Sequence, residues 1–272
     1  MSGRRIASFA TAVLAVLAFA VVAIVARGAL QSGPASSRSP KAAAENVTGP
    51  DQLGATGPQT FDLADAQADT PSSAALIATS TRRSIRVYRY AKVVRKPRLL
   101  RQRVFKGQHI PLVFSVRSQR KGWVRVQLPT RPNLSSAWVR RRDVRFTFTR
   151  MHVRVSLRQH RMDVYDGSRL RLRARIGVGK SLTPTPKGRY FVTDVVRPRD
   201  PKGFYGPYAL GLSAHSNVYT SFEGGNGQVG LHGTNRPGAI GSDVSHGCVR
   251  VRNSVITRMA RSLPLGTPVT IA

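Results

Sequence analysis

The only cysteine of the chain, Cys248, lies near two of the six histidines. A thiol attacks carbonyl groups as the thiolate, and its ordinary pKa of about 8.5 leaves it mostly protonated at neutral pH. A histidine within hydrogen-bonding reach can remove the proton and later protonate the leaving amine. His246 precedes Cys248 by two residues, and His232 precedes it by 16 across a loop rich in glycine and proline. This spacing predicts a thiol nucleophile activated by a histidine.

Two further neighbours of Cys248 fit the same chemistry. Gly247 lets backbone N–H groups approach a substrate oxygen, as an oxyanion hole requires. Arg250 has the planar guanidinium group that grips a carboxylate through two parallel hydrogen bonds. The alternative is structural: Arg250 would stabilise the fold in an ion pair, with Asp243 as a partner, and His246 would only shape the loop.

The segment HGTNRPGAIGSDVSHGCVRV, from His232 to Val251, resembles the catalytic motif of the L,D-transpeptidases that cross-link peptidoglycan. The TPTPKG loop from Thr183 to Gly188, the YGP motif at Tyr205 and the closing GTPVTI add further matches. The resemblance extends from His152 to the C-terminus. It implies a β-sandwich-like catalytic domain over residues 150–272 that needs no cofactor and no metal.

The same resemblance implies roles for individual residues. Cys248 is expected to be the nucleophile and His232 its general base, with the backbone carbonyl of Gly233 orienting the imidazole as an Asp side chain does in other triads. The remaining expected site residues complete the catalytic set (His246 and Gly247) or bind substrate (Arg250, Ser245 and Tyr205). Ser245 is also expected to support the catalytic loop.

The implied reaction is acyl transfer in the cell wall. The thiolate would attack a tetrapeptide stem at the bond between an L-centre, usually meso-diaminopimelate in this family, and D-Ala. D-Ala would leave, and the acyl group would pass to an amine of a neighbouring stem. Such cross-links serve wall biogenesis and cell shape, and carbapenems are expected to acylate Cys248.

Three other functions remain open from the residues. An L,D-carboxypeptidase would use water as the acceptor in place of an amine. A non-enzymatic wall-binding protein would make a non-catalytic domain the functional part. A metallohydrolase would bind zinc through His232, His246 and Cys248, because three ligands of these types suffice for a catalytic zinc.

The elements that must position the site are mostly strands. Alternating apolar and polar residues predict strands from about Met151 onward, with Asp166-Gly167 as a two-residue hairpin turn and FYGPYALGLS as a loop. One short helix is predicted from Asn253 to Ser262, with Asn253 as its N-cap. Further strands are expected at Tyr190–Val196, Val229–His232 and Val269–Ile271.

Residues 83–148 are predicted to form a separate small β domain. The phrase from Gly122 to Val144 resembles the end of bacterial SH3-like wall-binding domains, in which two tryptophans, here Trp123 and Trp138, bracket a hairpin. This resemblance implies an SH3-like β-barrel. The alternative for both tryptophans is ordinary core packing.

The N-terminus predicts a membrane anchor followed by a spacer. Ile6 to Ala26 is a run of 21 residues without charge, preceded by Arg4 and Arg5. As a helix it would measure about 31 Å, close to the roughly 30 Å hydrocarbon core of a bilayer. Residues 1–27 are therefore expected to be a single-pass signal anchor, with the rest of the chain outside the cytoplasm. Residues 28–82, rich in Ala, Ser, Thr, Gly and Pro, are expected to be a disordered spacer.

The charge of the chain points to anionic partners. Lys and Arg total 44 against 12 Asp and Glu, a formal net charge of +32. Such a surplus attracts polyanions over long range. No nucleic-acid-binding signature accompanies it, and export also argues against nucleic acid. Besides peptidoglycan stems, the expected partners are anionic wall polymers or lipid headgroups.

Overall fold

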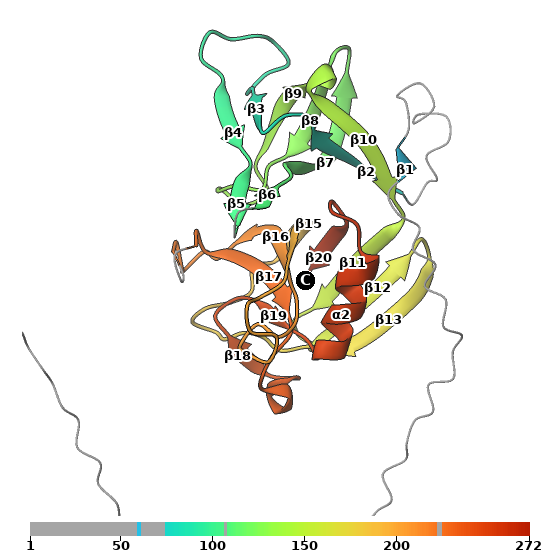
Figure 1. Ribbon diagram of the computed structural model, residues 1–272, viewed down its shortest axis with the longest axis vertical. Helices are drawn as coiled ribbons and strands as arrows, with labels where there is room; N and C mark the ends of the chain where they lie inside the picture. Colours follow the sequence, from blue (N-terminus) through green and yellow to red (C-terminus); the bar gives the residue numbers. More distant parts are fainter. Residues whose placement is uncertain (1–58, 61–73, 106–107, 222–224) are drawn as a thin grey trace, which may run out of the picture. The chain divides into compact units, whose positions relative to one another are not determined.

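The computed structural model describes residues 59–60, 74–105, 108–221 and 225–272. These residues form a six-stranded sheet, an eight-stranded sheet, three two-stranded pairs and one α-helix (Figure 1). The prediction of a mostly β chain with one short helix is confirmed for this part. The SH3-like barrel stays a prediction.

The six-stranded sheet is antiparallel throughout and has the order β1-β10-β2-β7-β8-β9. Alternating side chains of its strands form a compact core that includes Phe114, Val124, Val126 and Phe146. Trp123 is buried and meets the ring of Tyr88 edge-on at 5.1 Å, which agrees with a packing role. The strand bounds are β1 Gln59–Thr60, β2 Ala75–Ser80, β7 Val113–Arg120, β8 Trp123–Gln127, β9 Ser136–Arg140 and β10 Val144–Thr149.

The smaller pairs next to this sheet are β3 with β4 and β5 with β6. Their strands are short, and a 3₁₀ turn, η1, connects β9 to β10. The bounds are β3 Ser84–Val87, β4 Arg98–Arg101, β5 Arg103–Phe105, β6 Gln108–Ile110 and η1 Arg141–Asp143.

The predicted spacer over residues 28–82 extends too far toward the C-terminus. Strand β2 lies inside this range and pairs with β10 on one side and β7 on the other. Ile77 and Ala78 in β2 are 1% and 0% exposed. The composition of β2, averaged with the segment before it, resembles that of a linker. Its small and β-branched residues nevertheless form a stable strand, because the strand lies between two hydrogen-bonded neighbours.

The eight-stranded sheet has the order β13-β12-β11-β20-β15-β16-β17-β19. The last strand of the chain, β20, is inserted between β11 and β15, parallel to the first and antiparallel to the second (Figure 1). The strand bounds are β11 Met151–Ser156, β12 Arg161–Asp166, β13 Arg169–Arg175, β15 Gly188–Val196, β16 Ala209–His215, β17 Gln228–His232, β19 Val249–Arg250 and β20 Pro268–Ile271. The insertion makes the C-terminal residues part of the same core that positions the site.

Helix α2, Asn253–Ser262, has the predicted span and packs against β16 and β17. Ile256 and Met259 face the core, as the apolar spacing predicts. The predicted N-cap is wrong: Arg252 occupies that position, and Asn253 is the first helical residue. The Asn253 side chain instead accepts a hydrogen bond of 2.8 Å from the backbone N–H of Thr234, beside the end of β17. Asn253 therefore ties the helix to the loop after His232.

Two loop predictions are shifted. Asp166 is the last residue of β12 and pairs with Arg169, so the hairpin turn is Gly167-Ser168. Gly167 has φ of +58°, a conformation that glycine adopts without strain. The segment FYGPYALGLS is a loop only in its first part, because β16 begins at Ala209.

The predicted anchor at residues 1–27 lies outside the described residues. Within the part that the structure describes, no helix combines the length and the apolar character that crossing a bilayer requires. The membrane anchor therefore stays a prediction.

Candidate active site

Two neighbouring strands bring the histidine and the cysteine of the motif together. His232 is the last residue of β17, and Cys248 directly precedes β19. These strands pair in parallel, with Leu231 opposite Val249 and His232 opposite Arg250. The backbone of Gly230, also in β17, makes a hydrogen bond with the thiol. The sheet therefore places the thiol beside the strand that carries the imidazole, although 16 residues separate them along the chain.

Both groups line the same cavity. Six of the eight predicted site residues line it: Tyr205, His232, Ser245, His246, Cys248 and Arg250. A second cavity shares Tyr205, Gln228, Val229, His232 and Cys248 with the first and continues along β15 and β16. The thiol and the imidazole therefore lie where two cavities meet.

His232 is held in one tautomer by the backbone. Its Nδ1 lies 2.6 Å from the carbonyl oxygen of Gly233. A carbonyl only accepts, so Nδ1 carries the hydrogen and Nε2 carries the lone pair. Nε2 is buried and has no hydrogen-bond partner among the described residues. His232 therefore presents an unoccupied acceptor nitrogen to its surroundings.

Burial is the main influence on the charge of His232. The residue is 1% exposed, and its ring lies 5.0 Å from the ring of Tyr205 and 5.6 Å from that of Phe204. Burial lowers the pKa of His232 to about 4; the hydrogen bond to Gly233 opposes this shift, and the positive charge of Arg250 adds to it. The imidazole is therefore neutral at physiological pH.

The thiol is also neutral in the resting protein. Burial raises the pKa of Cys248, while the hydrogen bond from the backbone of Gly230 and the charge of Arg250 act in the opposite direction. With the imidazole neutral as well, the resting pair is a thiol and a free base. If this thiol attacks a carbonyl group, proton transfer must accompany the attack.

Ser245 shapes the loop before the cysteine. Its buried hydroxyl donates to the carbonyl of Cys248 at 2.6 Å and accepts from the N–H of Gly247 at 3.1 Å. Gly247 has φ of +116°, which a side chain would strain. The N–H of Gly247 is thus used within the loop. This geometry agrees with the expected support by Ser245 and leaves Gly247 a conformational role.

The TPTPKG loop supports Ser245 from the other side. The hydroxyl of Thr183 and the N–H of Lys180 both donate to the carbonyl of Ser245, each at 3.1 Å. Strand β14, Val178–Gly179, pairs in parallel with β18, Asp243–Ser245. The sequence resemblance assigned this loop to the catalytic domain. It did not show that the loop makes hydrogen bonds to the segment before Cys248.

Arg250 and Asp243 do not form the ion pair considered from the sequence. Asp243 contacts His160, at 2.8 Å between Oδ1 and Nε2. Arg250 is buried, and its guanidinium carbon lies 4.4 Å from the centre of the Phe204 ring. Its Nε has no hydrogen-bond partner in the described part of the chain. Arg250 thus lines the cavity with hydrogen-bonding capacity left for a ligand.

His246 differs from His232 in its surroundings. It is exposed, and its ring meets that of Tyr219 nearly perpendicularly, with 5.7 Å between centres. It lines the cavity without being enclosed by it. This position suits a residue that contacts substrate or shapes the entrance.

Six residues of the first cavity were not predicted as site residues: Phe204, Ser216, Tyr219, Gly227, Gln228 and Val229. Gln228 begins β17, and its amide donates to the hydroxyl of Thr193 and the carbonyl of Leu212. Arg103 also donates to Gln228, and to Asp194 at 2.5 Å. The position of Phe204 directly before the Tyr-Gly-Pro motif could have indicated a site residue. The other residues lie on segments that reach the cavity only in the folded chain.

The described residues contain no group of three or more His, Cys, Asp or Glu side chains placed to hold a metal ion. His232, His246 and Cys248 line one cavity but do not form such a group.

The decisive comparison is with protein-family models. Residues 150–271 match YkuD, the L,D-transpeptidase catalytic domain. This confirms the resemblance for the C-terminal domain and supports an enzyme of the L,D-transpeptidase kind.

Two curated relatives carry the name of this family. YkuD of Bacillus subtilis (strain 168), named as a candidate L,D-transpeptidase, is 36% identical over 120 residues, which cover 44% of this chain and 65% of that protein. YqjB of the same strain, with the same kind of name, is 30% identical over 103 residues and is covered to 56%. The solved catalytic domain of an E. faecium L,D-transpeptidase is 25% identical with a TM-score of 0.33, covering 45% of this chain and 96% of that one. The chain thus spans less than two thirds of these two curated relatives.

Two buried histidines predict acid lability. Burial lowers the pKa of His215, as of His232, to about 4, and Arg131 and Arg103 add to the shift of His215. Both rings stay neutral in the folded protein, so the unfolded chain takes up protons first as the pH falls below about 6.5. The free energy of unfolding should be highest above pH 6.5 and fall by roughly 3 kcal/mol per histidine by pH 4.

Urea unfolding of the full chain between pH 7 and pH 4 measures this loss. A His215→Asn variant should lose less stability over that range than the parent chain. An equal slope in the two proteins would contradict the assignment.

Proposed function

We propose that the protein is a peptidoglycan L,D-transpeptidase whose nucleophile is Cys248. The observation that carries the proposal is the buried His232 imidazole, which is oriented by the Gly233 carbonyl and lines the same cavity as the thiol with Nε2 unoccupied. An oriented neutral imidazole that lines the same cavity as a thiol supports the role of a general base.

In the first half-reaction, the sulfur attacks the carbonyl carbon between the L-centre and D-Ala while Nε2 of His232 takes the thiol proton. The Gly233 carbonyl stabilises the imidazolium that results. His232 then gives the proton to the nitrogen of D-Ala, the C–N bond breaks, and a thioester remains on Cys248. The neutral resting forms of His232 and Cys248 suit this order of steps, because the base is free to accept a proton at physiological pH.

In the second half-reaction, an amine of a neighbouring stem attacks the thioester. His232 takes a proton from this amine and returns it to the departing sulfur, which restores the thiol. The two cavities that meet at the thiol offer separate approaches for the donor stem and the acceptor stem. Arg250 is assigned to a substrate carboxylate because its buried guanidinium lines the first cavity with its Nε unpartnered.

The cellular setting belongs to the same proposal. Residues 1–27 would anchor the chain in the membrane, and residues 83–148, with their SH3-like resemblance, would lie with the catalytic domain outside the cytoplasm. The proposed substrates are the stem peptides of peptidoglycan. This setting is supported by the uncharged run after Arg4 and Arg5 and by the family match of residues 150–271.

The test is incubation of the full-length protein with a disaccharide-tetrapeptide, followed by mass analysis of the products. We expect free D-Ala and cross-linked dimers that have lost one D-Ala. Monomeric disaccharide-tripeptides alone would identify an L,D-carboxypeptidase instead. No release of D-Ala would favour a non-enzymatic wall-binding protein, and loss of activity on chelation would favour a zinc enzyme.

A further inference from the structure

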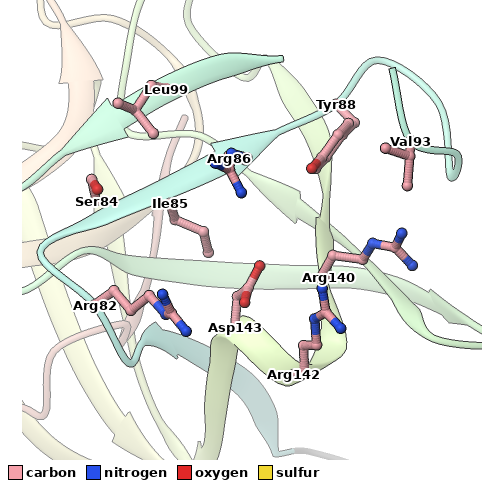
Figure 2. A pocket seen from close by; sticks show the side chains of 10 residues that line it. All are labelled: Arg82, Ser84, Ile85, Arg86, Tyr88, Val93, Leu99, Arg140, Arg142 and Asp143. Atoms are coloured by element: carbon pink, nitrogen blue, oxygen red, sulfur yellow. The ribbon is translucent and has the colours of Figure 1, made fainter. Parts of the chain in front are cut away.

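A cavity of about 600 Å³ lies in the N-terminal β domain, apart from the residues that line the two cavities at Cys248. Its walls come from β3, β4, the end of β9 and the turn η1, together with the loop between β3 and β4. Figure 2 shows the side chains around it. Its volume falls within the range of about 300–1,000 Å³ that is usual for ligand pockets.

The charge of this cavity is strongly positive. Four guanidinium groups and one carboxylate, that of Asp143, line it (Figure 2): the arginines are Arg82, Arg86, Arg140 and Arg142. Among the described residues, none of the four arginines has a carboxylate within ion-pairing distance. Four guanidinium groups with a single carboxylate among them repel one another, so an anion that enters the cavity relieves this repulsion.

One of the arginines is held in place. The guanidinium carbon of Arg140 lies 4.2 Å from the centre of the Trp123 ring, and Tyr88 packs edge-on against the same ring. Stacking of this kind leaves the N–H groups at the rim of the guanidinium free to bind an oxyanion. The cavity therefore has a preorganised cationic group beside its more exposed arginines.

Apolar side chains line the cavity as well. Val93 and Leu99 are 63% and 44% exposed, and Ile85 is buried. A ligand that fills the cavity would thus meet apolar side chains as well as guanidinium groups.

We propose that this cavity binds a segment of an anionic wall polymer, with phosphate or carboxylate groups on the arginines and the uncharged part of the repeat against Val93 and Leu99. Guanidinium groups bind both oxyanions in bidentate geometry. A concave cavity encloses a polymer segment, whereas a flat bilayer surface offers nothing that fills it. The choice of a wall polymer rests on the proposed extracytoplasmic function. The binding of an anion rests only on the residues that line the cavity.

Binding of the full-length protein to poly(glycerol phosphate), polygalacturonate and uncharged dextran tests this proposal. Either anionic polymer should bind, which identifies phosphate or carboxylate as the preferred group, and dextran should not. The double variant Arg86→Gln/Arg142→Gln should weaken binding at least about tenfold, because hydrogen bonds to charged groups contribute at that scale. Leu99→Gln should weaken binding several-fold with no change of charge.

The matched control is Arg120→Gln/Arg145→Gln. It removes two exposed arginines of the same domain that do not line the cavity. If this control weakens binding as much as the cavity variant, attraction is a general effect of net charge and the proposal is wrong. Unchanged binding by the cavity variant also overturns it. A third result would overturn the proposal: the cavity variant loses binding to phosphatidylglycerol vesicles but still binds the polymers. The cavity would then bind a membrane surface. D-Ala release, measured on the same samples, tests the proposed function separately.

Discussion

Replacement of Cys248 by alanine is expected to abolish release of D-Ala and formation of an acyl-enzyme. No other residue of the chain supplies a thiol. In the parent protein, a carbapenem should add one drug equivalent to the intact mass, because its strained ring offers an activated carbonyl to the sulfur. The Cys248→Ala variant should show no added mass, and penicillins should react more weakly than carbapenems with the parent.

The control for this variant is its fold. The change removes a single sulfur atom, so the alanine variant should stay folded and unfold at a urea concentration close to that of the parent. An acyl or drug adduct retained by a folded Cys248→Ala variant would eliminate Cys248 as the nucleophile. An unchanged mass of the parent protein under turnover conditions would count against the proposed chemistry as a whole.

Replacement of His232 should slow acylation of Cys248 by a factor of ~10²–10⁴, the usual contribution of a general base. The effect follows from the neutral resting pair: burial raises the pKa of Cys248, so without its general base the thiol stays protonated at neutral pH. Raising the pH should restore part of the rate, because hydroxide then removes the proton. In the parent, acylation should lose rate only as the pH falls toward about 4, where His232 becomes protonated.

His246→Ala is the matched control, since it removes the other histidine of the cavity. It should lower the rate while leaving the pH dependence of Cys248 alkylation nearly unchanged. The measurement is alkylation of the thiol as a function of pH in both variants. If His246→Ala shifts this profile upward and His232→Ala does not, the roles of the two histidines are reversed.

Local signals in the sequence were sufficient for several elements. Apolar spacing predicted the span of α2, and β15, β17 and β20 were predicted to within a residue or two. These elements are predictable because each carries its own periodicity and its own end signals. Strand β2 was missed because its stability comes from pairing with β10 and β7, partners more than 30 residues away along the chain.

The sequence by itself determined which residues have the chemistry: a single thiol, two nearby histidines and an arginine within one motif. Only the tertiary structure decided what each of them contacts. The parallel pairing of β17 with β19 brings His232 next to the cysteine loop, and Asp243 turns to His160 and away from Arg250. The physical reason is that pKa, tautomer and ion pairing depend on burial and on neighbours from distant segments. Local sequence does not encode those neighbours, so it could indicate a candidate nucleophile and a candidate base but not their resting protonation states.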